Sequence, residues 1–219
     1  MARRPDLVIF DCDGVLVDTE RLAVRLEVQL LAELGWEITE AEIVERFVGI
    51  SDGAMQRAIE ERTGRPLPPG WHEASTLRYR EAFAADLGPV PGVVEVLDRL
   101  DAEQITTCVA SSGSHEKMTF TLGLTGLDHR FAGRIFSATE VEHGKPAPDL
   151  FIHAASRMGV DPCGCVVVED SRPGVEAAVA AGMRALAYGG GVTPPAQLEL
   201  DGAEVFLRMD ALPALLALD

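Results

Sequence analysis

The strongest constraint on the fold of this chain is an alternation of short apolar runs with longer stretches of helical length. Runs rich in valine, isoleucine and other apolar residues predict strands at 7–10, 105–110, 134–137, 165–168 and 184–188. Stretches of helical length predict covering helices at 149–158, 174–181 and 211–218. Continuously apolar runs are typical of strands buried on both faces. We therefore expect an α/β fold, a Rossmann-like parallel sheet with helices on both faces.

The interval between the first two predicted strands is far longer than such a sheet requires, because a loop from strand to helix usually takes about 2–6 residues. Helical periodicity recurs within this interval at 21–34, 40–47, 54–62 and 72–83. Stretches rich in glycine or proline separate these segments. We interpret residues 17–86 as a small α-helical cap domain inserted into an α/β core domain made of 1–16 and 87–219.

Composition limits the partners of the protein. The formal net charge is −16, which repels nucleic acid and anionic lipid. No apolar run approaches the roughly 20 residues of a membrane helix, and the run that follows Arg3 and Arg4 is too short for a signal peptide. We expect a soluble, cytoplasmic protein, a monomer by default, with neither nucleic-acid nor membrane partners. An anionic substrate would need local positive charge from a metal, a lysine or helix N-termini.

Two aspartates follow the first predicted strand, in the sequence Asp11-Cys12-Asp13-Gly14. Residues i and i+2 of an extended chain project to the same side, so Asp11 and Asp13 can share one cavity. Two carboxylates held that close repel each other unless a cation or a shared proton intervenes. A metal ion is the natural resolution, although an acidic turn would explain this motif if it stood alone.

Three further strand ends carry polar side chains. Ser111 and Ser112 follow the second predicted strand, and we expect a helix to begin shortly after them. Lys145 stands between a glycine and two prolines that fix its backbone, and it would supply positive charge. Glu169 and Asp170 end the fourth strand and are oxygen ligands of the kind that Mg²⁺ prefers. Open α/β sheets bind ligands at the carboxyl ends of their strands, so we expect all four segments to meet.

Taken together, the paired acid, the hydroxyl, the lysine and the second paired acid, in this order, resemble the motifs of the haloacid dehalogenase superfamily. The resemblance is to its phosphatases and β-phosphoglucomutase-like enzymes, which carry a helical cap, and it spans nearly the whole chain. It implies a Mg²⁺-dependent phosphomonoester hydrolase that acts on a small phosphorylated metabolite through an aspartyl-phosphate.

The resemblance also implies a role for each motif residue. Asp11 would be the nucleophile, and Asp13 the general acid and then the general base. Ser111, Ser112 and Lys145 would bind the phosphoryl group. The Mg²⁺ ligands would be the carboxylates of Asp11, Glu169 and Asp170 and the backbone carbonyl of Asp13.

A sugar phosphomutase is the alternative within the same family. Thr19 and Gly49 match the mutase pattern, and with Glu20 they are candidate substrate contacts at the cap. Ala23 and Asp52, however, stand where β-phosphoglucomutases carry a cap histidine and a cap arginine. Without that arginine, a bisphosphate intermediate is poorly held in an acidic protein. These differences favour hydrolysis.

A receiver-type signalling module is the alternative outside the family, since it also uses a phosphorylated aspartate, Mg²⁺, a hydroxyl and a lysine. The second acid, Asp13, and the inserted cap argue against it. The sequence leaves the substrate open among sugar phosphates, phosphorylated acids and nucleoside monophosphates.

Overall fold

The computed structural model describes residues 4–48, 50 and 52–218. Its centre is a six-stranded parallel sheet in the order β3-β2-β1-β4-β5-β6. The strands are β1 (Leu7–Phe10), β2 (Thr106–Ser111), β3 (Ile135–Ser137), β4 (Cys165–Glu169), β5 (Arg184–Tyr188) and β6 (Ala203–Phe206). The predicted α/β fold is confirmed.

Strand β6 was not predicted from the sequence. It lies at the edge of the sheet, where it pairs only with β5. Of its four residues, Phe206 alone is fully buried and Glu204 is exposed. An edge strand that is only partly covered has no continuous apolar run, which is the pattern that identified the other five strands.

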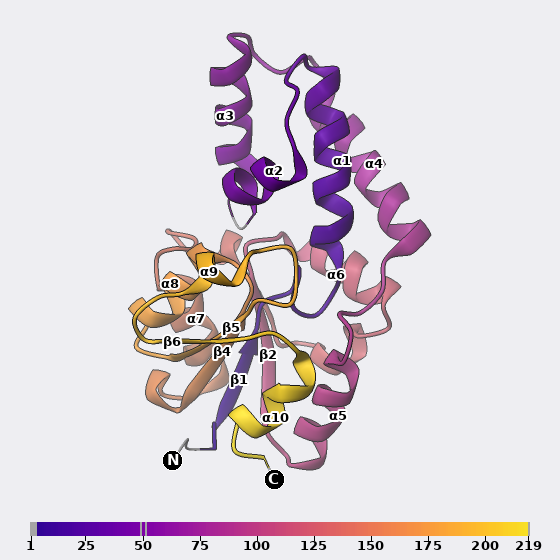
Figure 1. Cartoon of the computed structure of the whole chain (residues 1–219). Helices are drawn as coiled ribbons and strands as arrows, with labels where there is room; N and C mark the ends of the chain where they lie inside the picture. Colours follow the sequence, from indigo (N-terminus) through magenta and orange to yellow (C-terminus); the bar gives the residue numbers. More distant parts are fainter. Residues whose placement is uncertain (1–3, 49, 51, 219) are drawn as a thin grey trace.

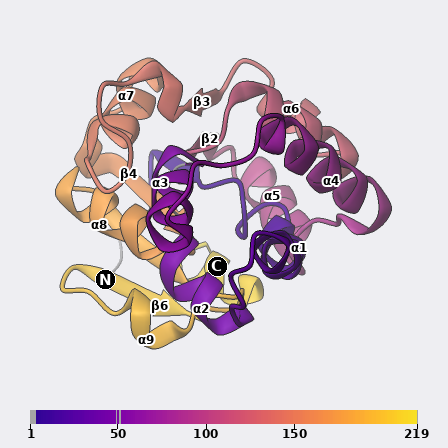
Figure 2. The same cartoon turned by 90° about the horizontal axis from the view of Figure 1, so that it is seen from above.

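Helices cover both faces of the sheet because successive side chains of a strand point to opposite sides. Val8 and Phe10 pack with α5 (Val93–Ala102), α6 (His115–Leu124) and α10 (Leu212–Leu215). Leu7 and Ile9 pack with α7 (Asp149–Met158), α8 (Arg172–Ala180) and α9 (Pro195–Leu198). Figure 2 shows α7 and α8 on one side of the strands and α5 and α6 on the other.

Two of the three covering helices predicted for the core have different bounds in the structure. The helix expected at 174–181 begins earlier, at Arg172, because the Ser171 hydroxyl caps it and Pro173 is compatible with a first turn. The helix expected at 211–218 is shorter, because the 3-10 turn Met209–Ala211 precedes α10, which ends at Leu215.

Four helices fill the long interval after β1. They are α1 (Thr19–Glu33), α2 (Glu40–Phe47), α3 (Asp52–Thr63) and α4 (Trp71–Asp86). Figure 1 shows them together beyond the carboxyl ends of the strands. They share an apolar cluster of their own around Leu31, Trp36, Ile43 and Ile59. The limits of the cap domain, 17 and 86, stay a prediction.

The chain enters and leaves this helical part through two adjacent segments. The Asp18 N–H donates to the Gly88 carbonyl at 3.0 Å, and the Val90 N–H donates to the Leu16 carbonyl at 3.0 Å. Arg21 pairs with the carboxylate of Asp18. The backbone bonds place both crossings side by side, next to the residues that follow β1.

Among the described residues, no helix has both the length and the apolar character that a bilayer span demands.

Candidate active site

Four sequence segments meet at the carboxyl edge of the sheet. Phe10, the last residue of β1, is in register with Val109 of β2 and Val168 of β4. Asp11 therefore emerges between the ends of these two strands, and its N–H donates to the Val168 carbonyl at 2.9 Å. Lys145 reaches the same place from the loop before α7. The predicted convergence of the strand ends is what the structure shows.

Lys145 is the buried centre of positive charge in this cluster. Only 2% of its side chain is exposed. Its Nζ donates to Asp11 Oδ1 at 2.5 Å, to Glu169 Oε1 at 2.5 Å and to the Ala110 carbonyl at 3.1 Å. Burial opposes the charge, but the two carboxylates outweigh it and raise the pKa of Lys145. The side chain therefore remains an ammonium.

Asp11 lies almost entirely out of solvent. Burial raises the pKa of its carboxyl to about 7, with Lys145 opposing the rise and the charges of Glu169 and Asp13 adding to it. Further positive charge beside Asp11 would favour the carboxylate, which is the form that a nucleophile needs.

Glu169 was predicted to bind Mg²⁺, and the structure gives it other partners. Its Oε1 accepts from Lys145, while its Oε2 accepts from the Ser171 N–H at 2.8 Å and the Ser171 hydroxyl at 2.9 Å. The backbone of Gly174 packs directly against this carboxylate. These contacts make Glu169 an orienting group for Lys145, and its role as a metal ligand stays a prediction.

Asp170 supplies the clearest observation in favour of a cation. Its Oδ2 is buried without a hydrogen-bond partner in the described part of the chain, and buried polar atoms are rarely left so. Burial, followed by the charge of Glu169, raises its pKa well above the usual range. A buried carboxylate oxygen next to Asp11 and Glu169 fits a hard cation such as Mg²⁺.

The donor set for such an ion is small. Across residues 4–48, 50 and 52–218, no three Asp, Glu, His or Cys side chains gather in a metal-binding arrangement. Asp11 and Asp170 together with the Asp13 backbone carbonyl would leave the rest of the shell to water and substrate. This fits Mg²⁺, because it usually keeps several waters and binds one or two protein carboxylates.

Gly14 makes room for the Asp170 carboxylate. It has a φ of +72°, and an added Cβ would lie 2.0 Å from Asp170 Oδ2. We predict that Gly14→Ala displaces this carboxylate and lowers kcat/KM for phosphate release about 10²-fold, the effect of misplacing a reacting group by about 1 Å. The apparent Mg²⁺ affinity falls with it, as measured by phosphate release against Mg²⁺ concentration.

Gly35→Ala is the matched control. Gly35 has a similar φ of +85°, but nothing lies within 4 Å of its added Cβ. It introduces the same backbone strain without the clash. Equal losses of activity in the two variants would show that the contact with Asp170 is unimportant.

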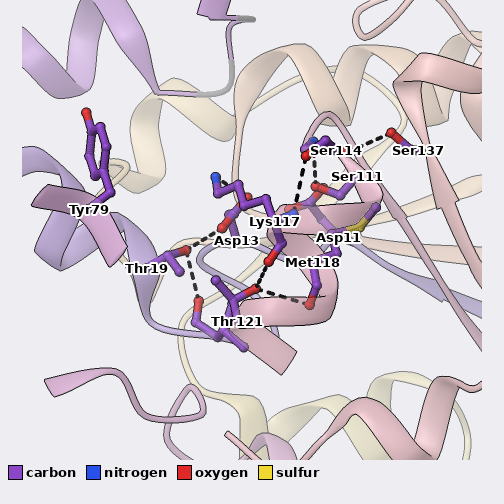
Figure 3. A network of polar contacts seen from close by, with 12 residues as sticks. Asp11, Asp13, Thr19, Tyr79, Ser111, Ser114, Lys117, Met118, Thr121 and Ser137 are labelled. Atoms are coloured by element: carbon purple, nitrogen blue, oxygen red, sulfur yellow. Dashed lines mark hydrogen bonds and ion pairs between the residues drawn. The ribbon is translucent and has the colours of Figure 1, made fainter. Parts of the chain in front are cut away.

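Asp13 has two side-chain donors, one on each oxygen. The Thr19 hydroxyl donates to Oδ1 at 2.6 Å, and the Lys117 ammonium donates to Oδ2 at 2.9 Å (Figure 3). Burial opposes ionisation, yet Lys117 and these hydrogen bonds together lower the pKa of Asp13. Asp13 is thus a carboxylate with both oxygens engaged.

Sequence reasoning missed Lys117. It lies in the first turn of α6, where the Lys117 N–H donates to the capping Ser114 hydroxyl. A signal was available, because Lys117 and Lys145 are the only lysines in the whole chain.

The segment after β2 forms a compact turn. Ser111 is buried, and its hydroxyl accepts from the Gly113 N–H at 3.2 Å. The Ser137 hydroxyl donates to the Gly113 carbonyl at 2.7 Å. Ser112 is half-buried and has no hydrogen bond from its side chain within the described residues. The role of Ser111 and Ser112 in binding phosphate stays a prediction.

The structure places two of the three residues that were predicted to contact the substrate from the cap. Thr19 lies against Asp13, as described above. Glu20 lies beside Gly14, and burial, with the charge of Asp13, raises its pKa to about 8. Gly49 lies outside the described residues. A cavity of about 610 Å³ meets the site at Gly14 and Glu20, and Tyr188 and Arg208 also line it.

Comparison with known proteins finds haloacid dehalogenase-like proteins by both sequence and structure. The model of a family described as haloacid dehalogenase-like hydrolase matches residues 5–182. The 6-phosphogluconate phosphatase of Escherichia coli is 31% identical over 82% of this chain and 80% of its own length. A haloacid dehalogenase-like protein of unknown function from Agrobacterium tumefaciens has a TM-score of 0.83 and 38% identity, over 97% of each chain. A putative β-phosphoglucomutase from Thermotoga maritima has a TM-score of 0.77 and 26% identity, over 96% of this chain and 98% of its own.

Proposed function

Because the chain belongs to the haloacid dehalogenase-like hydrolases, we propose that it uses Mg²⁺ to hydrolyse the phosphate monoester of a small phosphorylated metabolite. The chain is a phosphatase, like its named relatives. The observation that carries the proposal is the buried Asp11 carboxylate, which is hydrogen-bonded to Lys145 at the switch point of the sheet. Such a carboxylate with a fixed cation is suited to covalent phosphoryl transfer.

In the first step, an Asp11 oxygen attacks phosphorus and the bond from phosphorus to the ester oxygen breaks. The negative charge of the bound phosphate ester favours protonation of Asp13, so that Asp13 enters this step protonated and gives its proton to the departing alcohol. In the second step, Asp13 takes a proton from water, the water oxygen bonds to phosphorus, and the aspartyl-phosphate opens to inorganic phosphate and free Asp11. Lys145 stabilises the negative charge of the transferring group throughout, and Glu169 orients the ammonium.

Mg²⁺, when bound, supplies charge neutralisation at the transferring phosphoryl group. Asp11, Asp170 and the Asp13 carbonyl would hold it, since Asp170 has a buried oxygen that lacks a protein partner in the described part of the chain.

Residues 17–86 act as a cap in this proposal. Thr19, at the start of α1, orients Asp13, and Glu20 accepts hydrogen bonds from hydroxyl groups of the substrate. Gly49 stays a predicted substrate contact. Figure 1 supports this arrangement, because α1 rises from the carboxyl edge of the sheet.

Hydrolysis is preferred over phosphomutase activity. The likeness to a putative β-phosphoglucomutase supports a shared fold. At the two positions where mutases carry a cap histidine and a cap arginine, this chain has Ala23 and Asp52, and neither side chain can hold a second phosphate. The relative that acts on 6-phosphogluconate supports phosphorylated sugars and sugar acids as the substrate class.

A panel of small phosphate monoesters, assayed for phosphate release, tests the proposal. We expect release in the presence of Mg²⁺, a fall of about 10²-fold or more after chelation, and recovery when Mg²⁺ is restored. A folded protein that releases no phosphate from any ester contradicts the phosphatase function. A phosphorylated aspartate that persists for minutes without turnover would instead favour the signalling module.

A further inference from the structure

Each of the two lysines of this chain donates a hydrogen bond to one of the two proposed catalytic aspartates. The chain has 19 basic residues other than histidine, and all but Lys117 and Lys145 are arginines. Lys145 donates to Asp11 and Lys117 donates to Asp13. Arginine or histidine makes the other ion pairs given for the described residues, so the two lysines are found only at the catalytic aspartates and at Glu169. A lysine ammonium is a compact charge on a flexible stem, which suits a contact that must change.

The two lysines differ in burial. Lys145 is 2% exposed, whereas 45% of the Lys117 side chain is exposed. The backbone of Lys117 is fixed by the Ser114 cap. A Cβ on Gly113 would lie 3.5 Å from Lys117 Cδ and 3.7 Å from Asp13 Oδ2, so the stem passes over this glycine. Lys117 is thus fixed at its base, and its side chain is partly open to solvent.

The chemistry of Asp13 weakens one of these two contacts. One of its oxygens has to carry the proton that passes to the ester oxygen, and an ammonium that donates to the same oxygen favours the carboxylate and opposes protonation. Thr19 is 1% exposed and belongs to the first turn of α1, so its hydroxyl has little room to move. The more exposed Lys117 ammonium is therefore the donor that a substrate can displace.

An ammonium released from Asp13 binds an anion of the substrate more strongly than it binds water. Of the neighbouring carboxylates, Asp11 is already bonded to Lys145, and Glu20 is assigned above to hydroxyl groups of the substrate. The substrate itself can supply the anion on its leaving-group side. One ammonium matches one carboxylate, whereas a second phosphate would carry about two charges into an acidic site.

Building on the proposed phosphatase function, the geometry points to Lys117 as a specificity residue that moves from Asp13 to a carboxylate on the leaving group. The preferred substrates are then phosphate esters of hydroxy acids. With a neutral leaving group, Lys117 finds no acceptor and continues to compete for Asp13.

Matched pairs of esters test this assignment. Each pair differs by a carboxylate in place of a neutral group: phosphoglycolate and ethyl phosphate, 3-phosphoglycerate and glycerol 3-phosphate, 6-phosphogluconate and glucitol 6-phosphate. In the pair that contains the most active ester, we expect kcat/KM for the ester with a carboxylate to exceed that for its neutral partner about 10-fold or more. The difference should lie mainly in KM, because the neutral ester loses a hydrogen bond between charged groups.

In Lys117→Gln we expect this ratio to fall to about 1, and in Lys117→Arg to be partly kept. Because the two esters of a pair are compared on the same variant, an effect of the substitution on Asp13 changes both kcat/KM values alike and cancels in their ratio. Arg157→Gln is the control, because Arg157 is an exposed cation in the last turn of α7 and its loss changes the net charge equally. An acid preference that survives in Lys117→Gln, or one that is absent from the unaltered protein, overturns the inference while the phosphatase function stands.

Binding provides a readout that needs no turnover. Protein labelled with ¹³C at lysine Cε gives two side-chain signals, which Lys117→Gln assigns. With Mg²⁺ and the Asp11→Asn background, we expect phosphoglycolate and ethyl phosphate both to shift the Lys145 signal, and phosphoglycolate alone to shift that of Lys117. Equal shifts of Lys117 with both esters overturn the inference. Failure of every ester to shift Lys145, together with no phosphate release, overturns the proposed function as well.

Discussion

Asp11→Asn abolishes phosphate release, with kcat lower by at least about 10⁴-fold, the scale on which losing a nucleophile acts in other enzymes. The amide of asparagine cannot form the acyl-phosphate bond. The fold is retained, because Lys145 keeps Glu169 and the Ala110 carbonyl as partners. Steady-state phosphate release gives the rate. Intact-protein mass spectrometry after acid quenching detects the covalent phosphoryl group, which we expect on the unaltered protein only.

Asp98→Asn is the control for this substitution. Asp98 is an exposed carboxylate on α5 that pairs with Arg130, away from the strand ends. We expect it to keep full activity and covalent labelling. Labelling of the Asp11→Asn protein to the same extent as the unaltered protein would transfer the nucleophilic role to another residue.

Replacing Lys145 by methionine destabilises the protein by about 3–5 kcal/mol, because it leaves the buried charges of Asp11 and Glu169 without their cation. Methionine keeps much of the apolar volume, so lost packing against Phe151 contributes little. Phosphate release is lost at the same time. Urea unfolding followed by circular dichroism, without added Mg²⁺, measures the free energy of unfolding.

The other lysine is the matched control for stability. Lys117→Met removes an ion pair of which the lysine is 45% exposed, so we expect a cost below about 1 kcal/mol. Adding Glu169→Gln to Lys145→Met should recover part of the lost stability, since one of the two unpaired charges disappears. Equal destabilisation by the two methionine substitutions would mean that burial of the Lys145 charge does not matter.

The position of the site explains how an acidic protein can bind phosphate. The net charge of −16 repels anions at long range, but Lys145 and Lys117 concentrate positive charge at the carboxyl edge of the sheet. A cation at Asp170 would add to this local field. In our proposals the two lysines have different roles: the buried Lys145 contacts the transferred phosphoryl group, and the exposed Lys117 contacts the leaving group.

Much of the fold could be predicted because strands buried on both faces have to be continuously apolar. The run ending at Val168 is the clearest case, and the structure has β4 there. Strand β6 was not predicted because it lies at the edge of the sheet, where the exposed Glu204 interrupts its apolar run. The helix expected at 211–218 was overextended, since apolar periodicity does not distinguish a 3-10 turn from an α-helix.

By itself, the sequence determined which strand ends meet. Asp11 and Asp170 follow parallel strands, Ser111 ends another, and parallel strands bring their carboxyl ends to one edge. Only the tertiary structure decided which side chains touch there. Glu169 accepts from Lys145 and Ser171, and Lys117 reaches Asp13 across 104 residues of sequence. The physical reason is that periodicity and turn residues predict only local backbone conformation. The contact between the Lys117 ammonium and the Asp13 carboxylate depends on how α6 packs against the loop after β1.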